Sequence, residues 1–299
     1  MTHASTHVHR PRLVAILTCF NRRRLTLNCL RALRASAEAA GADVDAIVVD
    51  DASTDGTADA VRTEHPWAEV VDGSGSLFWN RGMHEGFGRA LQREADHYLW
   101  LNDDTELRVE ALSRLIEQQS QLRQIEGKPV ILVGATAERG SGRITYGGRV
   151  ARSRLRRFSY EIVWDASHPV RCEAIEGNCV LIPRELALSV GNLDPTFEHA
   201  MGDTDYGLRA QRAGFSVYVA AGVMGYCSDN ASAGTYFDET LPLSARWKHL
   251  TGRKGLPLRS WLHFTRRHGG LLWPLYFCWP YVRVVMSAMR GPRVRRAVS

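Results

Sequence analysis

Residues 45–64 read DAIVVDDASTDGTADAVRTE, in which a short Ile-Val-Val run leads through a polar, glycine-containing loop into a segment of helical spacing. The same order occurs upstream, where the apolar run LVAILTCF at 13–20 precedes a helical pattern at 23–36. Downstream, the strand-like runs EVVD at 69–72 and HYLWL at 97–101 flank another helical segment. Four strands that alternate with helices predict an open α/β sheet wound in parallel.

The chain beyond this region continues to alternate between strands and helices. The further predicted elements are a helix at 114–127, a strand at 129–136, a strand and helix within 174–191, and a helix and strand within 202–220. Gly214 marks the end of the last helix, because glycine tolerates the left-handed backbone found there. Residues 138–171 are rich in Arg, Gly and Tyr, which predicts hairpins or a flexible loop over a site.

The length of 299 residues and the apolar fraction of 44% suit a globular protein with a sizeable core. Residues 1–12, MTHASTHVHRPR, form a polar stretch that we expect to be disordered. This stretch contains no apolar segment of the kind found in signal peptides, so we expect the chain to remain in the cytoplasm.

The cysteines predict neither a disulfide framework nor a zinc site. No two of the six form a C-x-x-C pair, and most lie in apolar surroundings. We therefore expect buried, reduced thiols at Cys19, Cys29, Cys172, Cys179, Cys227 and Cys278.

The basic residues are concentrated at the C-terminal end. Residues 241–299 contain twelve Lys or Arg and no Asp or Glu, whereas the preceding 240 residues contain 26 basic and 32 acidic groups. The uncharged run at 271–282 is rich in aromatic residues, too short to span a bilayer and interrupted by Pro274 and Pro280. It suits a segment lying on an anionic membrane, and a core or dimer helix is the alternative. No base-stacking or groove-binding motif predicts a nucleic-acid partner.

The predicted strands end in polar residues. TCFN at 18–21, DDAS at 50–53 and NDD at 102–104 each follow an apolar run. In open α/β sheets, ligands bind outside the carboxyl ends of the strands, where the strand order reverses. No G-x-G-x-x-G motif separates the first strand from its helix, which counts against a dinucleotide-binding dehydrogenase.

Four stretches together resemble the inverting glycosyltransferases of family 2, which have the GT-A fold. They are AILTCFNR at 15–22, VVDDASTDGT at 48–57, WLNDDTEL at 100–107 and GDTDYGLRAQRAG at 202–214. The subgroup most resembled comprises the rhamnosyl- and galactofuranosyltransferases that build bacterial surface polysaccharides. The resemblance covers residues 13–230, about three quarters of the chain.

The resemblance implies a division of the chain into functional parts. Residues 13–240 would form the GT-A domain, with a nucleotide-binding part at 13–107 and an acceptor part at 108–240. The resemblance says little about the last 60 residues, but the basic and aromatic composition of 241–299 predicts a helical extension that contacts a membrane or a second subunit.

The resemblance further implies a nucleotide pocket at the ends of the first two strands. Asp51 would accept the ring N–H of the base, which would be uracil or thymine, while Thr18 and Asn21 line the pocket and Ser53 lies in the same loop. Alternatively, Asp51, Ser53 and Thr54 are turn and N-cap residues of the next helix. In the segment SLFWNRGMHEGFGRA at 76–90, Asn80 and Arg81 would lie near the nucleotide and its diphosphate.

Trp79, in the same segment, would touch the sugar or belong to the core.

The stretch LNDDTEL stands where the family carries its Asp-x-Asp signature for a divalent cation. Mg²⁺ and Mn²⁺ prefer oxygen ligands and often take one or two carboxylates plus phosphate oxygens. The resemblance assigns Asp104 to the metal, and Asn102 and Asp103 to ribose or a metal-bound water. Alternatively, the two acids cap a helix that begins near Thr105.

The resemblance places the general base within MGDTDYGLR. Asp203 would take the proton of the acceptor hydroxyl, and Asp205 would be a second acid near the acceptor. Gly202 replaces the first acid of the usual pattern, and Asp203 as the N-cap of a helix is the alternative. Many relatives have a metal-binding His after this helix, but residues 200–248 contain none and Cys227 stands near its position. Because hard cations disfavour thiolates, we expect fewer protein ligands here.

These observations predict a metal-dependent hexosyltransferase that inverts the anomeric carbon. It would move rhamnose or another hexose from a dTDP- or UDP-linked donor to a growing glycan or lipid-linked acceptor, on the inner face of the cell membrane. Two other functions remain open: a noncatalytic scaffold that binds sugar nucleotides or glycans, and a nucleotidyltransferase. The nucleotide product separates these functions, because a nucleotidyltransferase releases pyrophosphate.

Overall fold

The computed structural model describes residues 10–153, 156–228 and 235–289. The strands within these ranges are β1 (Arg12–Cys19), β2 (Asp43–Asp50), β3 (Ala68–Asp72), β4 (His97–Leu101), β5 (Glu106–Leu107), β6 (Val130–Ala137), β7 (Ile144–Tyr146), β8 (Gly148–Ala151), β9 (Tyr160–Val163), β10 (Val170–Arg171), β11 (Ala174–Ile175), β12 (Cys179–Pro183) and β13 (Ser216–Tyr226). The helices are α1 (Arg23–Ala39), α2 (Thr57–Glu64), α3 (Phe78–Ala90), α4 (Ala111–Glu126), α5 (Arg184–Val190), α6 (Gly202–Arg212), α7 (Leu243–Thr251), α8 (Leu258–His268), the 3₁₀ turn η2 (Gly270–Leu272) and α9 (Trp273–Met289).

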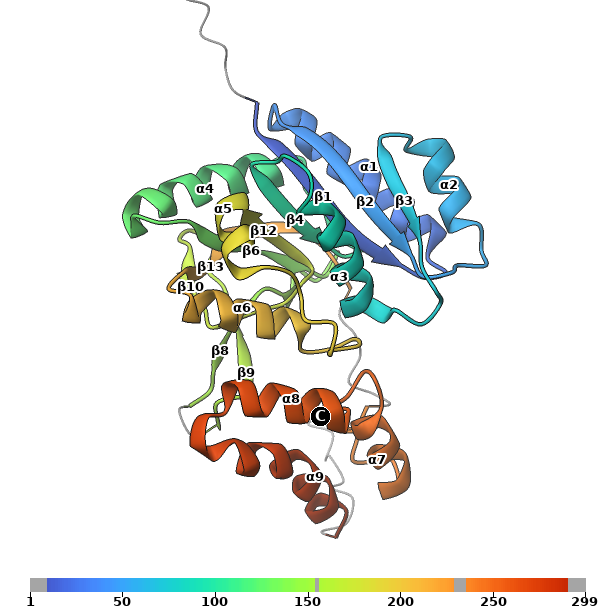
Figure 1. The fold of residues 1–299 in the computed structure, drawn as a ribbon, viewed down its shortest axis with the longest axis vertical. Helices are drawn as coiled ribbons and strands as arrows, with labels where there is room; N and C mark the ends of the chain where they lie inside the picture. The colour runs from blue at the N-terminus through green and yellow to red at the C-terminus, as the bar shows by residue number, and fades with distance from the viewer. Residues whose placement is uncertain (1–9, 154–155, 229–234, 290–299) are drawn as a thin grey trace, which may run out of the picture.

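One large mixed sheet forms the centre of the molecule (Figure 1). Its strand order is β10-β13-β6-β12-β4-β1-β2-β3, with β5 and β7 attached to β13 and β6. Strand β1 pairs in parallel with both β2 and β4, and β2 pairs in parallel with β3, as the alternation of strands and helices predicts. Strand β12 departs from this pattern, because it is antiparallel to both β4 and β6.

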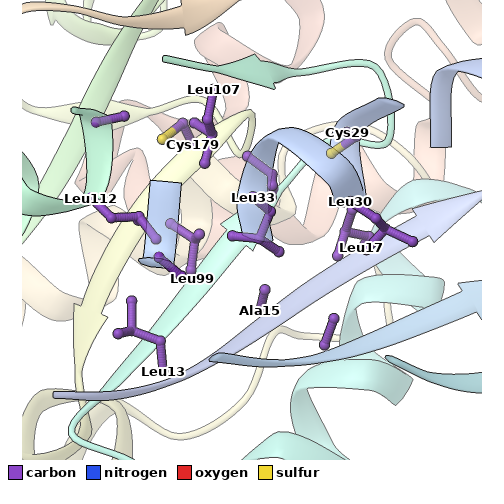
Figure 2. Close-up of a cluster of buried hydrophobic side chains, with 14 of the residues drawn as sticks. Leu13, Ala15, Leu17, Cys29, Leu30, Leu33, Leu99, Leu107, Leu112 and Cys179 are labelled. Carbon is purple, nitrogen blue, oxygen red and sulfur yellow. The ribbon is translucent and has the colours of Figure 1, made fainter. Parts of the chain in front are cut away.

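Apolar side chains cover both faces of the sheet. On one face, residues of β1 and β4 such as Leu17 and Leu99 pack against Leu30 and Leu33 of α1 and Leu112 of α4 (Figure 2). On the other face, α3, α5 and α6 pack against the alternate strand positions. Burial on both faces explains why these strands are continuous apolar runs rather than alternating ones.

A second, smaller sheet has the order β11-β8-β9. Strands β8 and β9 come from the segment predicted to form hairpins, and β11 follows just after it. The prediction of strands there is confirmed, with residues 154–155 outside the described part of the chain. Of the predicted disordered N-terminus, residues 1–9 also lie outside the described residues, and Arg12 already belongs to β1. All six cysteines lie in the described ranges and are free thiols. Five are buried as expected, but the expectation of burial is wrong for Cys278, which is exposed on α9.

Helices α7, α8 and α9 form a layer below the main sheet (Figure 1). Their apolar core contains Trp261 and Phe264 of α8 and Tyr281 of α9, and it also includes Phe197 from the segment that precedes α6. No helix among the described residues is long and apolar enough to cross a membrane.

Helix α9 has two different faces. Tyr281 and Val284 are buried against the other helices of the layer. On the opposite side Leu275, Trp279 and Met289 are exposed, at 67%, 58% and 80% of their surface.

A buried charge cluster joins this layer to α6. The carboxylate of Asp205 has no exposed surface and accepts hydrogen bonds from Arg209 Nε at 2.8 Å, Arg267 Nη1 at 2.9 Å and His268 Nε2 at 2.8 Å. Burial alone would raise the pKa of Asp205, but the hydrogen bonds from His268 and Arg209 outweigh it and lower the pKa. Arg267 also pairs with Asp194 at 2.6 Å. The cluster therefore fastens α8 to the rest of the fold.

We expect Asp205→Asn to lower the free energy of unfolding by about 3 kcal/mol, because a buried ion pair that loses one partner leaves the other charge uncompensated. Denaturant unfolding followed by circular dichroism measures the change. Asp59→Asn is the matched control, since Asp59 is 88% exposed in its pair with Arg62 and should change stability by less than about 0.5 kcal/mol. Equal effects of the two substitutions would contradict the structural role of Asp205.

Candidate functional site

The carboxyl ends of β1, β2 and β4 meet at one edge of the sheet. The chain runs from β1 outward through β2 to β3 and then returns to form β4 on the other side of β1. The strand order therefore reverses between β1 and β4. This is the position where open α/β sheets bind ligands. The predicted residues of the first three motifs lie in the loops at this edge.

Asp103 and Asp104 follow β4 and share one basic partner. Arg22 Nη1 lies 3.2 Å from Asp103 Oδ1 and 2.6 Å from Asp104 Oδ2. The side chain of Asp103 is only 8% exposed, whereas that of Asp104 is 23% exposed. The pair is thus held by a guanidinium from the loop after β1, which is the neighbouring strand.

Burial raises the pKa of Asp103 to about 7, although Arg22 acts in the opposite direction. Asp103 Oδ2 is buried and has no hydrogen-bond partner among the described residues. The alternative that the two acids cap a helix near Thr105 is wrong, because Glu106 begins the short strand β5, which pairs with β13. The carboxylates are therefore not explained by local helix capping.

Cys227 lies beside Asp104. Its Sγ donates to Asp104 Oδ1 at 3.3 Å and accepts from Asn178 Nδ2 at 3.5 Å. Burial, followed by the charge of Asp104, raises the pKa of the Cys227 thiol to about 12. The sulfur is thus a protonated donor to Asp104 in this structure.

Asp51 binds the backbone of the segment that leads into α3. The side chain is buried and accepts hydrogen bonds from the backbone N–H groups of Gly75 at 2.7 Å, Leu77 at 2.9 Å and Phe78 at 3.0 Å. Both carboxylate oxygens are therefore already used by the loop before α3. The carboxylate therefore holds that loop against β2, and the expected contact of Asp51 with the base stays a prediction.

Asn21 and Ser53 connect the loops that follow β1 and β2. Asn21 has a left-handed backbone with φ of 53°, and its Oδ1 accepts from the backbone N–H of Thr54 at 2.7 Å. Ser53 Oγ accepts from the backbone N–H of Asn21 at 2.8 Å. Thr18, at the end of β1, lies so close to α3 that a Cβ on Gly82 would be 2.4 Å from its hydroxyl oxygen. These three residues therefore lie together at the predicted edge.

Trp79 connects the Asn-Asp-Asp motif at 102–104 with the segment before β12. Its indole Nε1 donates to Asn102 Oδ1 at 2.8 Å. The ring lies on Gly177, where a Cβ would approach the ring to 2.2 Å. The backbone N–H of Gly177 in turn donates to Asp203 Oδ2 at 3.1 Å. A continuous series of contacts thus joins the Asn-Asp-Asp motif at 102–104 to Asp203.

Asp203 lies in the first turn of α6 and is not its N-cap, a position that Met201 occupies with φ of 76°. Its Oδ1 accepts from the backbone N–H of Thr204 at 2.7 Å. Burial raises the pKa of Asp203 despite these backbone hydrogen bonds. A carboxylate with a raised pKa suits a general base.

Asn80 and Gly202 occupy one tightly packed position. Asn80 is fully buried, and its Nδ2 donates to the carbonyl oxygens of Asp194 at 2.9 Å and Phe197 at 2.8 Å. A Cβ on Gly202 would lie 1.6 Å from Asn80 Oδ1. The glycine in place of the usual acid therefore makes room for Asn80. The amide thus fastens α3 to the segment before α6, and the expected place of Asn80 near the nucleotide stays a prediction.

Arg81 is partly exposed, and its Nε donates to the carbonyl oxygen of Pro195 at 3.2 Å. The carboxylate of Asp205 has no exposed surface and is bound by Arg209, Arg267 and His268. Its expected place near the acceptor stays a prediction.

Asp103 and Asp104 are the candidate ligands for a divalent cation. No group of three His, Cys, Asp or Glu that could hold a metal occurs among the described residues. Asp103 and Asp104 nevertheless present hard oxygen donors, including the unpartnered Oδ2 of Asp103. This donor set fits Mg²⁺ or Mn²⁺ if phosphate oxygens of a substrate complete the shell.

Three residues of the site were missed by the sequence analysis. The motif AILTCFNR contains Arg22 but predicts no role for it. Residues 174–191 predict only a strand and a helix, with no role for Gly177 or Asn178. The polar EGN before the apolar CVLIP was the available signal. Its position next to β4 depends on the antiparallel insertion of β12, which sequence periodicity does not reveal.

We expect Gly202→Ala to destabilise the protein by about 1–3 kcal/mol, because the new methyl group must displace the buried Asn80 amide. A double-mutant cycle with Asn80→Ala should show coupling, with the double variant losing less than the sum of the single losses. Gly207→Ala in the same helix is the control, since its nearest neighbouring atom would be 3.3 Å away. Additive losses at positions 80 and 202 would contradict this packing.

Comparisons with known proteins bear on the fold and the family. One solved structure with the same fold is "Mannosyltransferase PcManGT from Pyrobaculum calidifontis in complex with GDP-Man and Mn2+", with a TM-score of 0.56 and 17% identity. The match covers 96% of this chain and 77% of that one. No curated protein matches the sequence significantly. The profile of the family described as "Glycosyltransferase like family 2" matches residues 11–249, and with the GT-A fold and the acid motifs at its sheet edge, the chain belongs to that family.

Proposed function

We propose that the protein is an inverting, metal-assisted hexosyltransferase. It transfers one sugar from a UDP- or dTDP-linked donor to a growing glycan or lipid-linked acceptor at an anionic membrane surface. The observation that carries the proposal is the series of contacts from Asn102 through Trp79 and Gly177 to Asp203. This series connects the Asn-Asp-Asp motif, the candidate site for the donor, with the candidate base.

The donor would bind at the carboxyl ends of β1, β2 and β4. Thr18, Asn21 and Ser53 would border the nucleotide, and Arg22 and Arg81 offer guanidinium forks for the diphosphate. Asp104, together with Asp103, would hold Mg²⁺ or Mn²⁺. When bound, the cation neutralises negative charge on the departing diphosphate. The similarly folded mannosyltransferase is a complex with GDP-Man and Mn²⁺, which supports this ligand chemistry.

The acceptor would bind on the side of Asp203. In the proposed reaction the acceptor oxygen attacks the anomeric carbon from the face opposite the diphosphate, and its proton passes to a carboxylate oxygen of Asp203. The bond between the anomeric carbon and the phosphate oxygen breaks, and its electron pair leaves with the nucleoside diphosphate. The backbone N–H groups of Thr204 and Gly177 hold the two oxygens of Asp203 in place. Trp79 lies between the two sides, where it would contact the sugar.

The C-terminal helices would place the site at a membrane. The outward face of α9 carries Leu275, Trp279 and Met289, and residues 241–299 contain twelve basic and no acidic side chains. Apolar residues on one helix face with surrounding positive charge are typical of segments that lie in the interface of an anionic bilayer. The basic residues beyond position 289 lie outside the described part of the chain.

We expect Asp203→Asn to reduce the turnover number by about 10²–10⁴-fold, the usual contribution of a general base. Because burial raises the pKa of Asp203 above its ordinary value of 3.8, and only the deprotonated form accepts a proton, the rate of the unchanged protein should fall on the acid side at a midpoint above 3.8. Nucleoside diphosphate release across the pH range measures both effects.

Donor binding, followed by calorimetry, should be retained in the Asp203→Asn variant. Unchanged turnover in this variant would contradict the assigned base. Release of pyrophosphate would indicate a nucleotidyltransferase, and nucleotide binding without any turnover would indicate a noncatalytic scaffold.

We expect the double substitution Leu275→Glu and Trp279→Glu to reduce binding to vesicles that contain phosphatidylglycerol by at least tenfold, because it places two negative charges on the outward face of α9. Sedimentation with vesicles measures the bound fraction. Binding of the unchanged protein should also fall as salt increases, since exposed charges are screened.

Ile125→Glu is the control, because Ile125 is 78% exposed on α4, away from the C-terminal helices. If the unchanged protein ignores vesicles and is a dimer that the double substitution converts to a monomer, the outward face of α9 is a subunit interface and the membrane proposal is wrong.

A further inference from the structure

Arg22 contacts both acids of the Asn-Asp-Asp motif, and the proposed metal site does not explain these contacts. A single nitrogen, Arg22 Nη1, contacts Asp103 Oδ1 at 3.2 Å and Asp104 Oδ2 at 2.6 Å. Arg22 directly precedes α1, and 44% of its side chain is exposed. The positive charge that the acid pair requires is therefore provided by the chain itself.

The contacts of Asp104 show what a cation would have to displace. Its Oδ2 accepts from Arg22, and its Oδ1 accepts from the Cys227 thiol. Both oxygens of the more exposed acid are thus engaged, whereas the free Oδ2 of Asp103 is buried. A cation that binds Asp104 through Oδ2 must displace Arg22 from that oxygen.

A diphosphate would change this competition in two ways. Its oxygens would add ligands to the cation, which two carboxylates alone hold incompletely. They would also accept the guanidinium fork of Arg22, which is exposed enough to turn outward. The nucleotide would therefore compensate Arg22 for the loss of its carboxylate partners.

We propose that Arg22 competes with the divalent cation for Asp104, so that the metal binds tightly only together with the diphosphate of the donor. Arg22 thereby couples the two ligands: the nucleotide raises the affinity for metal, and by thermodynamic reciprocity the metal raises the affinity for nucleotide by the same factor. This inference rests on the proposed function in one respect, namely that Asp104 binds metal.

The test measures Mn²⁺ binding rather than activity. Electron paramagnetic resonance of free Mn²⁺ gives the dissociation constant with the metal alone and with UDP or dTDP present. We expect Arg22→Gln to bind Mn²⁺ alone at least tenfold more tightly than the unchanged protein. The factor by which the nucleotide improves Mn²⁺ affinity should be smaller in the variant.

Two matched variants separate the contact from the general charge. Arg24→Gln removes the same charge from an exposed position in the first turn of α1, and should bind Mn²⁺ like the unchanged protein. Arg22→Gln combined with Asp104→Asn should lose the gained affinity. Circular dichroism checks that each variant is folded.

The outcomes distinguish this inference from the proposed function. Equal Mn²⁺ affinity of the unchanged protein and Arg22→Gln, with nucleotide-dependent binding in both, overturns the competition and leaves the metal site. A tenfold gain in Arg24→Gln as well would show a general charge effect and also overturn it. Absence of Mn²⁺ binding in every variant, even with nucleotide, overturns both proposals.

Discussion

The antiparallel pairing of β12 with β4 is the constraint on which the arrangement of the site depends. In this register Cys179 at the beginning of β12 lies opposite Leu101 at the end of β4. The residues that precede β12 are therefore brought beside the residues that follow β4. Asn102 donates its backbone N–H to the Asn178 carbonyl oxygen at 3.1 Å, and Gly177 connects to Asp203. A parallel β12 would place these groups at opposite edges of the sheet.

Much of the nucleotide-side fold could be predicted from the sequence, because its strands are buried on both faces. The runs LVAILTCF, DAIVVD and HYLWL are apolar without alternation, and the structure forms parallel strands there. The proximity of their polar ends was also predictable, because parallel strands bring their carboxyl ends to one edge of the sheet. Asp103 and Asp104 lie at that edge as expected.

The roles of several acids could not be predicted, because they depend on partners distant in sequence. Asp51 is used by the backbone of the loop before α3, and Asp205 is used by Arg267 and His268 of a helix about 60 residues further on. A family motif shows where such acids stand in the sequence but not which of them form structural hydrogen bonds and ion pairs. Arg22 shows the converse, because a residue without an assigned role proves to contact both acids of the motif.

The site combines groups that remain available with groups that are fixed by structure. Asp203 and Asp104 are partly exposed, while Asn80, Asp51 and Asp205 are buried and stabilise the surrounding segments. The cluster at Asp205 also connects α6, which carries Asp203, to the C-terminal helices. If those helices rest on a membrane, the same contacts orient the base toward a lipid-linked acceptor.

The anomeric configuration of the transferred sugar tests the central claim most directly. With a nucleotide sugar labelled with ¹³C at the anomeric carbon, the one-bond carbon–hydrogen coupling of the product reports that configuration by nuclear magnetic resonance. In-line attack assisted by a single base predicts a linkage opposite in configuration to that of the donor. A product that retains the configuration of the donor would contradict the account.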